Sequence, residues 1–178
     1  MKKIMFNDKY GLTQAVLASW KTQTRRIPFE GNLGLISLLP GQLIATAKYN
    51  IGEEIAIAQK YSDLTSIIPF ALKQELVRLP GWKNKMFVKA DLMPHRIRIT
   101  NIRVERLQNI SEEDCIAEGI WRAHDVGFEG TTYWYHGLVN SSFRTAKEAY
   151  ASLIDKISGR GTWESNPWVF VYDFELVK

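Results

Sequence analysis

Short apolar runs alternate with polar turns along the chain, and their spacing predicts interspersed strands and helices. Apolar positions with a period near 3.6 residues indicate helices, whereas a period of two indicates strands. The predicted strands are residues 3–6, 43–49, 54–59, 96–107 and 168–176, with the second and third forming a hairpin. The predicted helices are one that ends near Trp20, residues 70–76, one opening at Ser111 and one from Thr145 to Gly159.

Polar residues and glycines mark the ends of the two later helices. Ser111-Glu112-Glu113-Asp114 and Thr145-Ala146-Lys147-Glu148 both resemble capping boxes, and Gly119 and Gly159 follow the helical patterns. Asn101 predicts a bend or bulge inside the strand over 96–107.

The element order β-α-β-β-(α)-β-α-loop-α-β lacks the regular alternation of a doubly wound sheet, and residues 122–143 are rich in Gly, Tyr and His and predict a long loop. An α+β fold therefore fits, built as a compact mixed sheet or a small mixed β-barrel with flanking helices. The chain has 178 residues and 46% hydrophobic content, which predicts one domain over 1–178.

Composition and charge predict the cellular compartment and the charge of the partners. Cys115 is the only cysteine, so no intramolecular disulfide forms and a reducing cytoplasm is expected. No apolar run has the length of a membrane span, so a soluble protein without a membrane partner is expected. The net charge of +4 mildly favours anionic partners.

Residues 20–26, Trp-Lys-Thr-Gln-Thr-Arg-Arg, are the richest candidate site. One interpretation is a solvated helix C-terminus, where cations complement the helix dipole. The other is an anion or nucleotide site, because arginine forks suit phosphate. If the segment is extended, Thr22, Thr24 and Arg26 share one face and Arg25 takes the other.

Three further features carry weaker signals. Arg96 and Arg98 point the same way in a strand, as a basic ridge for a phosphate backbone or as an ordinary solvated face. Aromatic residues could stack bases, although they more often form a core or lid; they are Trp121, Phe128, Tyr133, Trp134 and Tyr135. The three histidines lack metal-ligand spacing, so we expect no metal and no cofactor.

Several segments, taken in order over nearly the whole chain, resemble the ASCH domain family of the PUA-like superfamily. The segments are Lys21-Thr22-Gln23-Thr24-Arg25-Arg26, Gly52-Glu53-Glu54-Ile55-Ala56-Ile57, Val104-Glu105-Arg106-Leu107, Ala117-Glu118-Gly119-Ile120 and Asn166-Pro167-Trp168-Val169-Phe170. The resemblance implies a small β-barrel whose cleft binds RNA or nucleotides. This chain is longer than the compact members, and we expect insertions near 60–90 and 122–143.

Some bacterial ASCH members are acetylcytidine amidohydrolases, and their proposed catalytic Lys, Thr and Glu resemble Lys21, Thr24 and Glu118. A threonine nucleophile needs a base, and a lysine serves only when its ammonium form is disfavoured. Two assignments stay open. Lys21 is the base with Glu118 orienting it, or Glu118 is the base with Lys21 polarising the scissile carbonyl. Under both, Arg26 positions the substrate or stabilises developing negative charge.

The same surface also fits RNA or nucleotide binding without turnover, and this is the function the sequence favours. Lys21, Arg25 and Arg26 would then bind phosphates, and Thr22 would also contact the ligand. Trp20 or Tyr49 would stack an unpaired base. A third alternative is a protein-interaction domain with a vestigial cleft.

Overall fold

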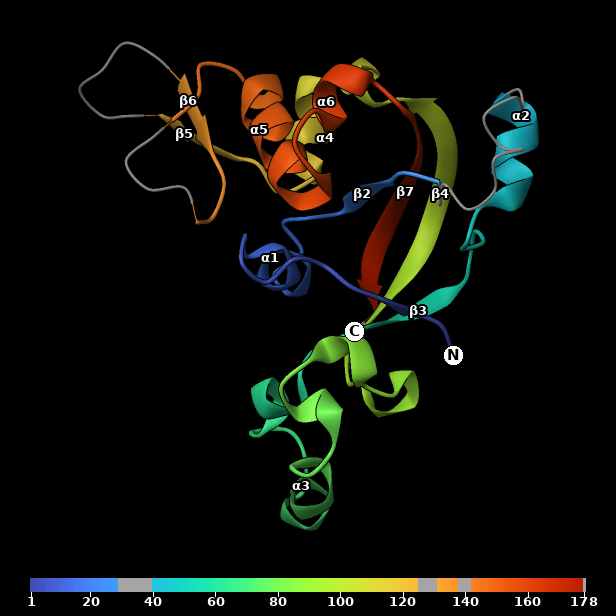
Figure 1. Ribbon diagram of the computed structural model, residues 1–178, viewed down its shortest axis with the longest axis vertical. Helices are drawn as coiled ribbons and strands as arrows, with labels where there is room; N and C mark the ends of the chain where they lie inside the picture. The colour runs from blue at the N-terminus through green and yellow to red at the C-terminus, as the bar shows by residue number, and fades with distance from the viewer. Residues whose placement is uncertain (29–39, 125–130, 138–141, 178) are drawn as a thin grey trace.

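The computed structural model describes residues 1–28, 40–124, 131–137 and 142–177. Its centre is a five-stranded mixed sheet in the order β1-β3-β4-β7-β2 (Figure 1). The strands are β1 (Lys3–Ile4), β2 (Gln23–Arg26), β3 (Glu54–Ile57), β4 (Arg96–Arg106) and β7 (Trp168–Val177). β1 runs parallel to β3, and the other neighbours are antiparallel.

The two longest strands, β4 and β7, are neighbours inside the sheet. They pair from Arg96↔Val177 to Arg106↔Trp168, with a shift in register between Ile99 and Asn101. The bulge predicted at Asn101 is therefore confirmed. Because a bulge increases local twist and bends a strand, β4 and β7 can curve around the core (Figure 1).

Helices α4 (Glu112–Ala117), α5 (Ala146–Ser158) and α6 (Thr162–Ser165) gather at one end of the sheet, and α1 (Leu12–Leu17) lies near β2 (Figure 1). Helix α5 begins with the predicted capping box, in which Thr145 and Glu148 cap each other's backbone amides. It buries Tyr150 and Leu153 in the main core. Ser111 caps α4 by accepting from the Asp114 amide.

The prediction of a strand over 43–49 was wrong. Pro40–Leu43 forms helix α2, and Ile44–Thr46 forms a 3-10 turn. A short apolar run does not distinguish strand from helix; of this run only Leu43 and Tyr49 are buried in the main core. The predicted hairpin is absent for the same reason, since β3 pairs with β1 and β4.

The prediction that 122–143 is a loop throughout was also wrong. Strands β5 (Trp121–His124) and β6 (Thr131–Trp134) pair antiparallel, with Trp121 opposite Trp134. The glycines suggested a loop, but the aromatic and threonine residues between them favour a strand. Phe128 lies outside the described residues.

Residues 58–93 form a unit with its own small core below the sheet in Figure 1. It contains helix α3 (Phe70–Leu76), which was predicted at the same bounds, and several 3-10 turns. Its buried side chains are Ala58, Tyr61, Leu64, Leu76, Val88 and Met93, packed with Ala56 of β3. Among the described residues no helix is long and apolar enough to cross a membrane.

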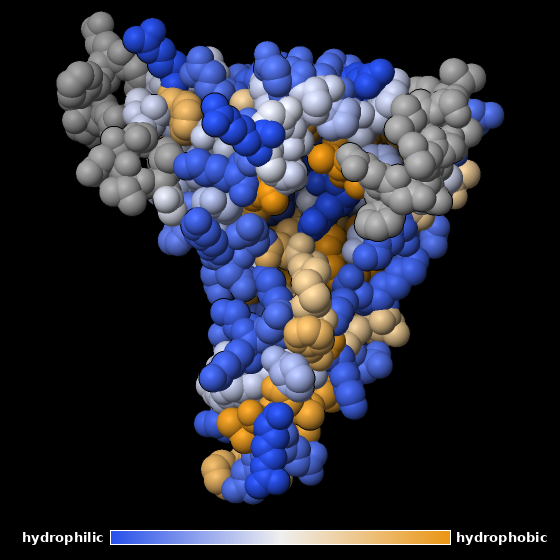
Figure 2. Space-filling model, in the orientation of Figure 1, coloured by the Kyte–Doolittle hydropathy of each residue, from blue (hydrophilic) through white to orange (hydrophobic). Residues whose placement is uncertain are grey.

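The α+β class is confirmed, but the five-stranded sheet is open among the described residues, with β1 and β2 at its two edges. The two edge strands, β1 and β2, are not paired with each other, and we call the gap between them the seam. A side chain of β2 crosses the seam, since Arg26 Nη2 donates to the carbonyl of Met5, the residue after β1, at 2.7 Å. In the space-filling view the surface here is hollowed, with hydrophilic residues between hydrophobic ones (Figure 2).

Candidate functional site

A pocket of about 250 Å³ lies where β2 meets helices α4 and α5, and we call it the Lys21 pocket. Its polar walls are Asn7, Lys21, Thr24, Arg25, Arg26, Glu118 and Ser158, and its larger apolar walls are Met5, Phe6, Leu12, Ile27, Tyr150, Leu153, Ile154 and Ile157. Five of the residues singled out in the sequence thus share one cavity: Lys21, Thr24, Arg25, Arg26 and Glu118.

Lys21 and Glu118 form a buried ion pair in this pocket. Lys21 Nζ lies 2.5 Å from Glu118 Oε2 and donates to the Glu118 carbonyl at 2.8 Å. The side chains are only 2% and 6% exposed. Since two buried charges gain little net stability over apolar side chains of similar volume, this pair is not explained by stability alone.

Local backbone geometry brings the two residues together. After α1 the chain turns at Ser19, which has a φ of 60°, and the amide of Lys21 donates back to the Ala15 carbonyl. Glu118 is the C-cap of α4, and Gly119 follows with a φ of 101°. The Thr22 amide donates to the Ala117 carbonyl at 2.9 Å, which fixes β2 against the end of α4.

Burial dominates the electrostatics of Lys21. Desolvation lowers the pKa of its ammonium, and this effect outweighs the opposing attraction of Glu118; Arg26 and Arg25 lower the pKa further. A lysine in this setting loses its proton more readily than an exposed lysine, so it meets the condition for a general base.

Arg25 is held by carboxylates rather than left free for a ligand. Its guanidinium forms ion pairs with Glu105 at 2.5 Å, Asp114 at 2.7 Å and Glu118 at 3.4 Å. Its side chain is 0% exposed. Arg103 binds the same Asp114 at 2.6 Å, which extends the network to β4. We therefore assign Arg25 to orienting Glu118, although the sequence predicted it as a ligand contact.

Thr24 and Arg26 belong to β2 and line the Lys21 pocket, but Arg25 between them lines it too, and Thr22 precedes the strand. Thr24 is buried and pairs in register with Tyr172 of β7. Arg26 lines the Lys21 pocket and also a second, larger pocket. Its Nε is buried and has no hydrogen-bond partner among the described residues.

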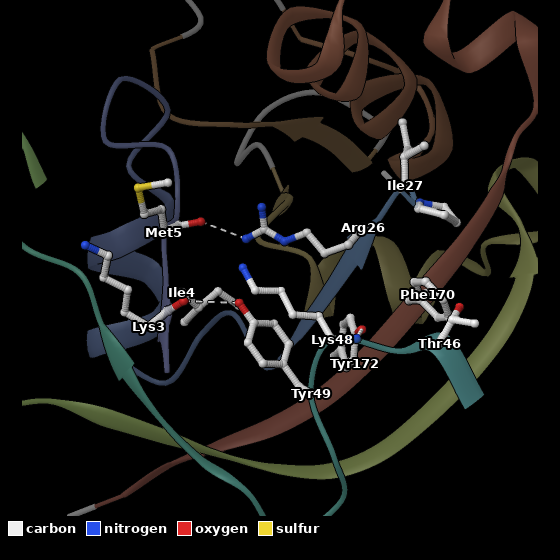
Figure 3. Close-up of a pocket in the computed structure, with 11 residues that line it drawn as sticks. Lys3, Ile4, Met5, Arg26, Ile27, Thr46, Lys48, Tyr49, Phe170 and Tyr172 are labelled. Carbon is white, nitrogen blue, oxygen red and sulfur yellow. Dashed lines mark hydrogen bonds between the residues drawn. The ribbon is translucent and has the colours of Figure 1, made fainter. Parts of the chain in front are cut away.

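The second pocket measures about 400 Å³ and lies in the seam; we call it the Tyr49 pocket (Figure 3). Its walls are Lys3, Ile4, Met5, Arg26, Ile27, Pro28, Thr46, Lys48, Tyr49, Phe170 and Tyr172. It shares Met5, Arg26 and Ile27 with the Lys21 pocket. The two pockets are therefore adjacent, with Arg26 between them.

The other predicted ligand contacts are placed differently. Tyr49 lines the Tyr49 pocket, where its ring lies edge-on to Tyr172 at 5.2 Å. Trp20 is 58% exposed and contacts Trp121 in a separate surface hollow, outside both pockets. The Thr22 side chain is exposed and lines neither pocket.

Sequence reasoning missed Lys48 and Tyr172 as wall residues. Lys48 was assigned to a strand, and only its position beside Tyr49 signalled a role. Tyr172 was one of several aromatic residues in the terminal strand. The Lys48 amide donates to Tyr172 Oη at 3.1 Å, which fixes the segment before Tyr49 against β7.

The remaining candidates carry less chemistry. Arg98 pairs with Glu54 at 2.8 Å and Glu175 at 3.3 Å, so the basic ridge is partly neutralised. Cys115 is buried, and desolvation raises the pKa of its thiol to about 12, as expected of a packing residue. Within the described ranges no cluster of three His, Cys, Asp or Glu residues could hold a metal ion.

Comparisons of the chain with protein-family models, with curated proteins and with solved structures return no match.

Proposed function

We propose that the Lys21 pocket binds the base of a nucleotide, free or within unpaired RNA, in an ASCH-like domain whose curved sheet corresponds to a PUA-like barrel. One observation carries the proposal: Lys21, Thr24, Arg26 and Glu118 line one cavity, although 97 residues separate Lys21 from Glu118. Their identity and order are what the family resemblance requires.

The composition of the pocket suits a nucleobase. Phe6, Leu12 and Tyr150 supply apolar walls for a flat ring, and the ion pair and hydroxyl supply hydrogen-bonding groups. A cavity that is largely apolar with a few convergent polar groups is the usual form of a small-molecule site, with volumes of about 300–1,000 Å³. The two adjacent pockets together reach this range.

A second candidate function, hydrolysis of an acylated nucleoside, is favoured by the lowered pKa of Lys21 in the pocket of Thr24. In this reaction Thr24 Oγ1 attacks the acyl carbon while its proton passes to Lys21. The exocyclic amine of the base leaves and takes that proton. Water then hydrolyses the threonine ester, which releases the acid and restores the hydroxyl.

Of the two catalytic assignments, the charges favour Lys21 as base. Arg25 pairs with Glu118 Oε1, so the carboxylate keeps a cationic partner even when Lys21 is neutral. Glu118 Oε2 meanwhile accepts from Lys21 Nζ, so the two carboxylate oxygens serve different partners. In this arrangement Glu118 orients the amine, and Arg25 positions Glu118.

The test is turnover and binding of N4-acetylcytidine and cytidine by the wild type and by Lys21→Ala, Thr24→Ala and Glu118→Ala variants that melt cooperatively. Thr24→Ser serves as the conservative control because it keeps the hydroxyl. Hydrolysis requires turnover that is lost in the Ala variants and retained in Thr24→Ser. Binding without turnover supports recognition alone, and the absence of both contradicts a site for cytidine or its acetyl derivative.

A further inference from the structure

The Tyr49 pocket gathers cations without a balancing carboxylate. Arg26, Lys48 and Lys3 line it, and no Asp or Glu is among its described wall residues. The Lys3 amine is already used, since it donates to the carbonyls of Met86 at 2.6 Å and Val88 at 2.7 Å. Arg26 and Lys48 are thus the cations that remain for a ligand.

The side chains of Arg26 and Lys48 point into the same space, whereas Lys3 points away from it (Figure 3). Arg26 donates to the Met5 carbonyl through Nη2, and its buried Nε has no described partner. A buried donor without an acceptor is costly, so the guanidinium is incompletely satisfied as it stands. Lys48 Nζ lies 5.4 Å from the centre of the Tyr49 ring, an aromatic neighbour that does not neutralise it.

The phenols of the pocket do not supply the missing negative charge. Tyr49 Oη donates to the Lys3 carbonyl at 3.2 Å. Burial raises the pKa of Tyr49 to about 12, although Arg26 opposes the shift, so the phenol stays neutral at physiological pH. The pocket is therefore a positive site with apolar walls of Phe170, Tyr172 and Ile4.

We propose that Arg26 and Lys48 bind the phosphate of the nucleotide whose base enters the Lys21 pocket. The inference rests on the proposed function, and it assigns the ligand class as a phosphorylated nucleoside rather than a free nucleoside. Arginine supplies a planar fork and lysine a point charge, which is a common pairing for phosphate oxygens. Because Arg26 lies between the two pockets, it contacts both halves of the ligand.

The test is calorimetric titration of the four ribonucleosides, their 5′-monophosphates and a short single-stranded RNA. The proteins are the wild type, Lys48→Gln and the control Lys9→Gln. Lys9 also lies over a tyrosine ring, at 5.5 Å from the centre of Tyr10, but outside both pockets. At least about tenfold tighter binding of one monophosphate than of its nucleoside is expected, as charge-assisted hydrogen bonds predict.

Lys48→Gln should remove most of that preference and leave the affinity for the nucleoside unchanged, whereas Lys9→Gln should change neither. Tighter binding of the RNA than of the monophosphate assigns the phosphate to a nucleic-acid backbone, and equal binding assigns it to a free nucleotide. Equal affinity of wild type for nucleoside and monophosphate overturns the phosphate site alone. No binding of any of these ligands overturns the proposed function itself.

Discussion

Glu118 forms ion pairs with both Lys21 and Arg25. The assignment of Lys21 as base and the assignment of Glu118 as base predict different rates of turnover when the charge of Glu118 is removed. With Lys21 as base, Glu118→Gln removes the attraction that raises the pKa of Lys21, while desolvation still lowers it. Turnover then persists at a reduced level. With Glu118 as base, turnover in Glu118→Gln is lost altogether. Initial rates of acetylcytidine hydrolysis by the wild type and Glu118→Gln distinguish the assignments.

If the site hydrolyses an acylated nucleoside with Lys21 as base, the proton on Lys21 sets the pH dependence of turnover. In that assignment the neutral amine is the active form, so the rate should fall as the pH drops through the lowered pKa of Lys21. In Glu118→Gln this acid limb should move to lower pH. A pH–rate profile of kcat for both proteins checks the shift, and an unmoved limb contradicts the role of Lys21.

Lys21 also determines the direction in which the free energy of unfolding changes with pH. Its pKa is lower in the folded state than its ordinary value of 10.5, so the unfolded chain binds more protons between those two values. The contribution of Lys21 to the free energy of unfolding therefore rises with pH across that window. Lys21→Met should flatten this rise, as measured by urea denaturation at several pH values.

At the level of elements, the end of α4 depends on Gly119. This residue has a φ of 101°, and an added Cβ would lie 3.3 Å from Leu12 Cδ2 and 3.8 Å from Lys21 Cβ. We expect Gly119→Ala to lower the free energy of unfolding by about 1–3 kcal/mol through strain in the backbone. It should also weaken ligand binding, because it displaces Glu118 from Lys21.

Gly52→Ala is the matched control for Gly119→Ala. Gly52 has a φ of 81°, but an added Cβ there meets no atom within 4 Å. It therefore reports the backbone strain without the contact, and it lies outside both pockets. Chemical denaturation and ligand titration of both variants are the measurements. Equal loss of affinity in the two contradicts the positioning role of Gly119.

The unit over 58–93 supports a wall of the site through Lys85. Its amine donates to Asp8 Oδ1 at 2.6 Å, to Thr13 Oγ1 at 3.2 Å and to the Phe6 carbonyl. The segment Met5–Asn7 lines the Lys21 pocket. Lys85→Met should loosen this wall and weaken nucleotide binding several-fold, whereas Lys83→Met, at an exposed position of the same unit, should not. Calorimetric titration tests both, and unchanged affinity in Lys85→Met contradicts the supporting role.

At the scale of the whole molecule, two basic surfaces could attract RNA, and the structure separates them. Arg96 and Arg98 pair with Glu54 on an exposed strand face, whereas Arg26 and Lys48 have no carboxylate beside them among the described wall residues. Lys48→Gln should therefore reduce the salt dependence of RNA binding, and Arg98→Gln should leave it nearly unchanged. Titrations of RNA at several salt concentrations decide between the two surfaces. A reduced salt dependence in Arg98→Gln, with none in Lys48→Gln, would place RNA on the surface of Arg96 and Arg98.

The sequence predicted the elements with strong local signals and failed where the signal was short or mixed. The capping box at Thr145, the α3 bounds and the bulge at Asn101 depend on local rules, and all three are confirmed. The apolar run over 43–49 fits either a strand or a helix, and in the structure it contains the end of α2 and a 3-10 turn. Open or closed geometry of the sheet depends on how distant edges meet, which no local pattern reveals.

The candidate site shows the same division. The polar run at 20–26 indicated Lys21, Thr24 and Arg26 directly, whereas Glu118 came from the family resemblance. The engagement of Arg25 with three carboxylates depends on β4 and α4, which are distant in sequence. Lys48 joins the site only because the segment before Tyr49 crosses to β7, a tertiary contact without a signature in its own sequence.

The most direct test of the two adjacent pockets as the binding site is amide chemical-shift mapping during titration of the uniformly ¹⁵N-labelled protein with ribonucleoside monophosphates. We predict that the largest perturbations cluster at β2, at Glu118 and Gly119, and around Lys48 and Tyr49. Saturable perturbations confined to the Arg96–Arg98 face or to the surface around Trp20, or none at millimolar nucleotide, would contradict this assignment.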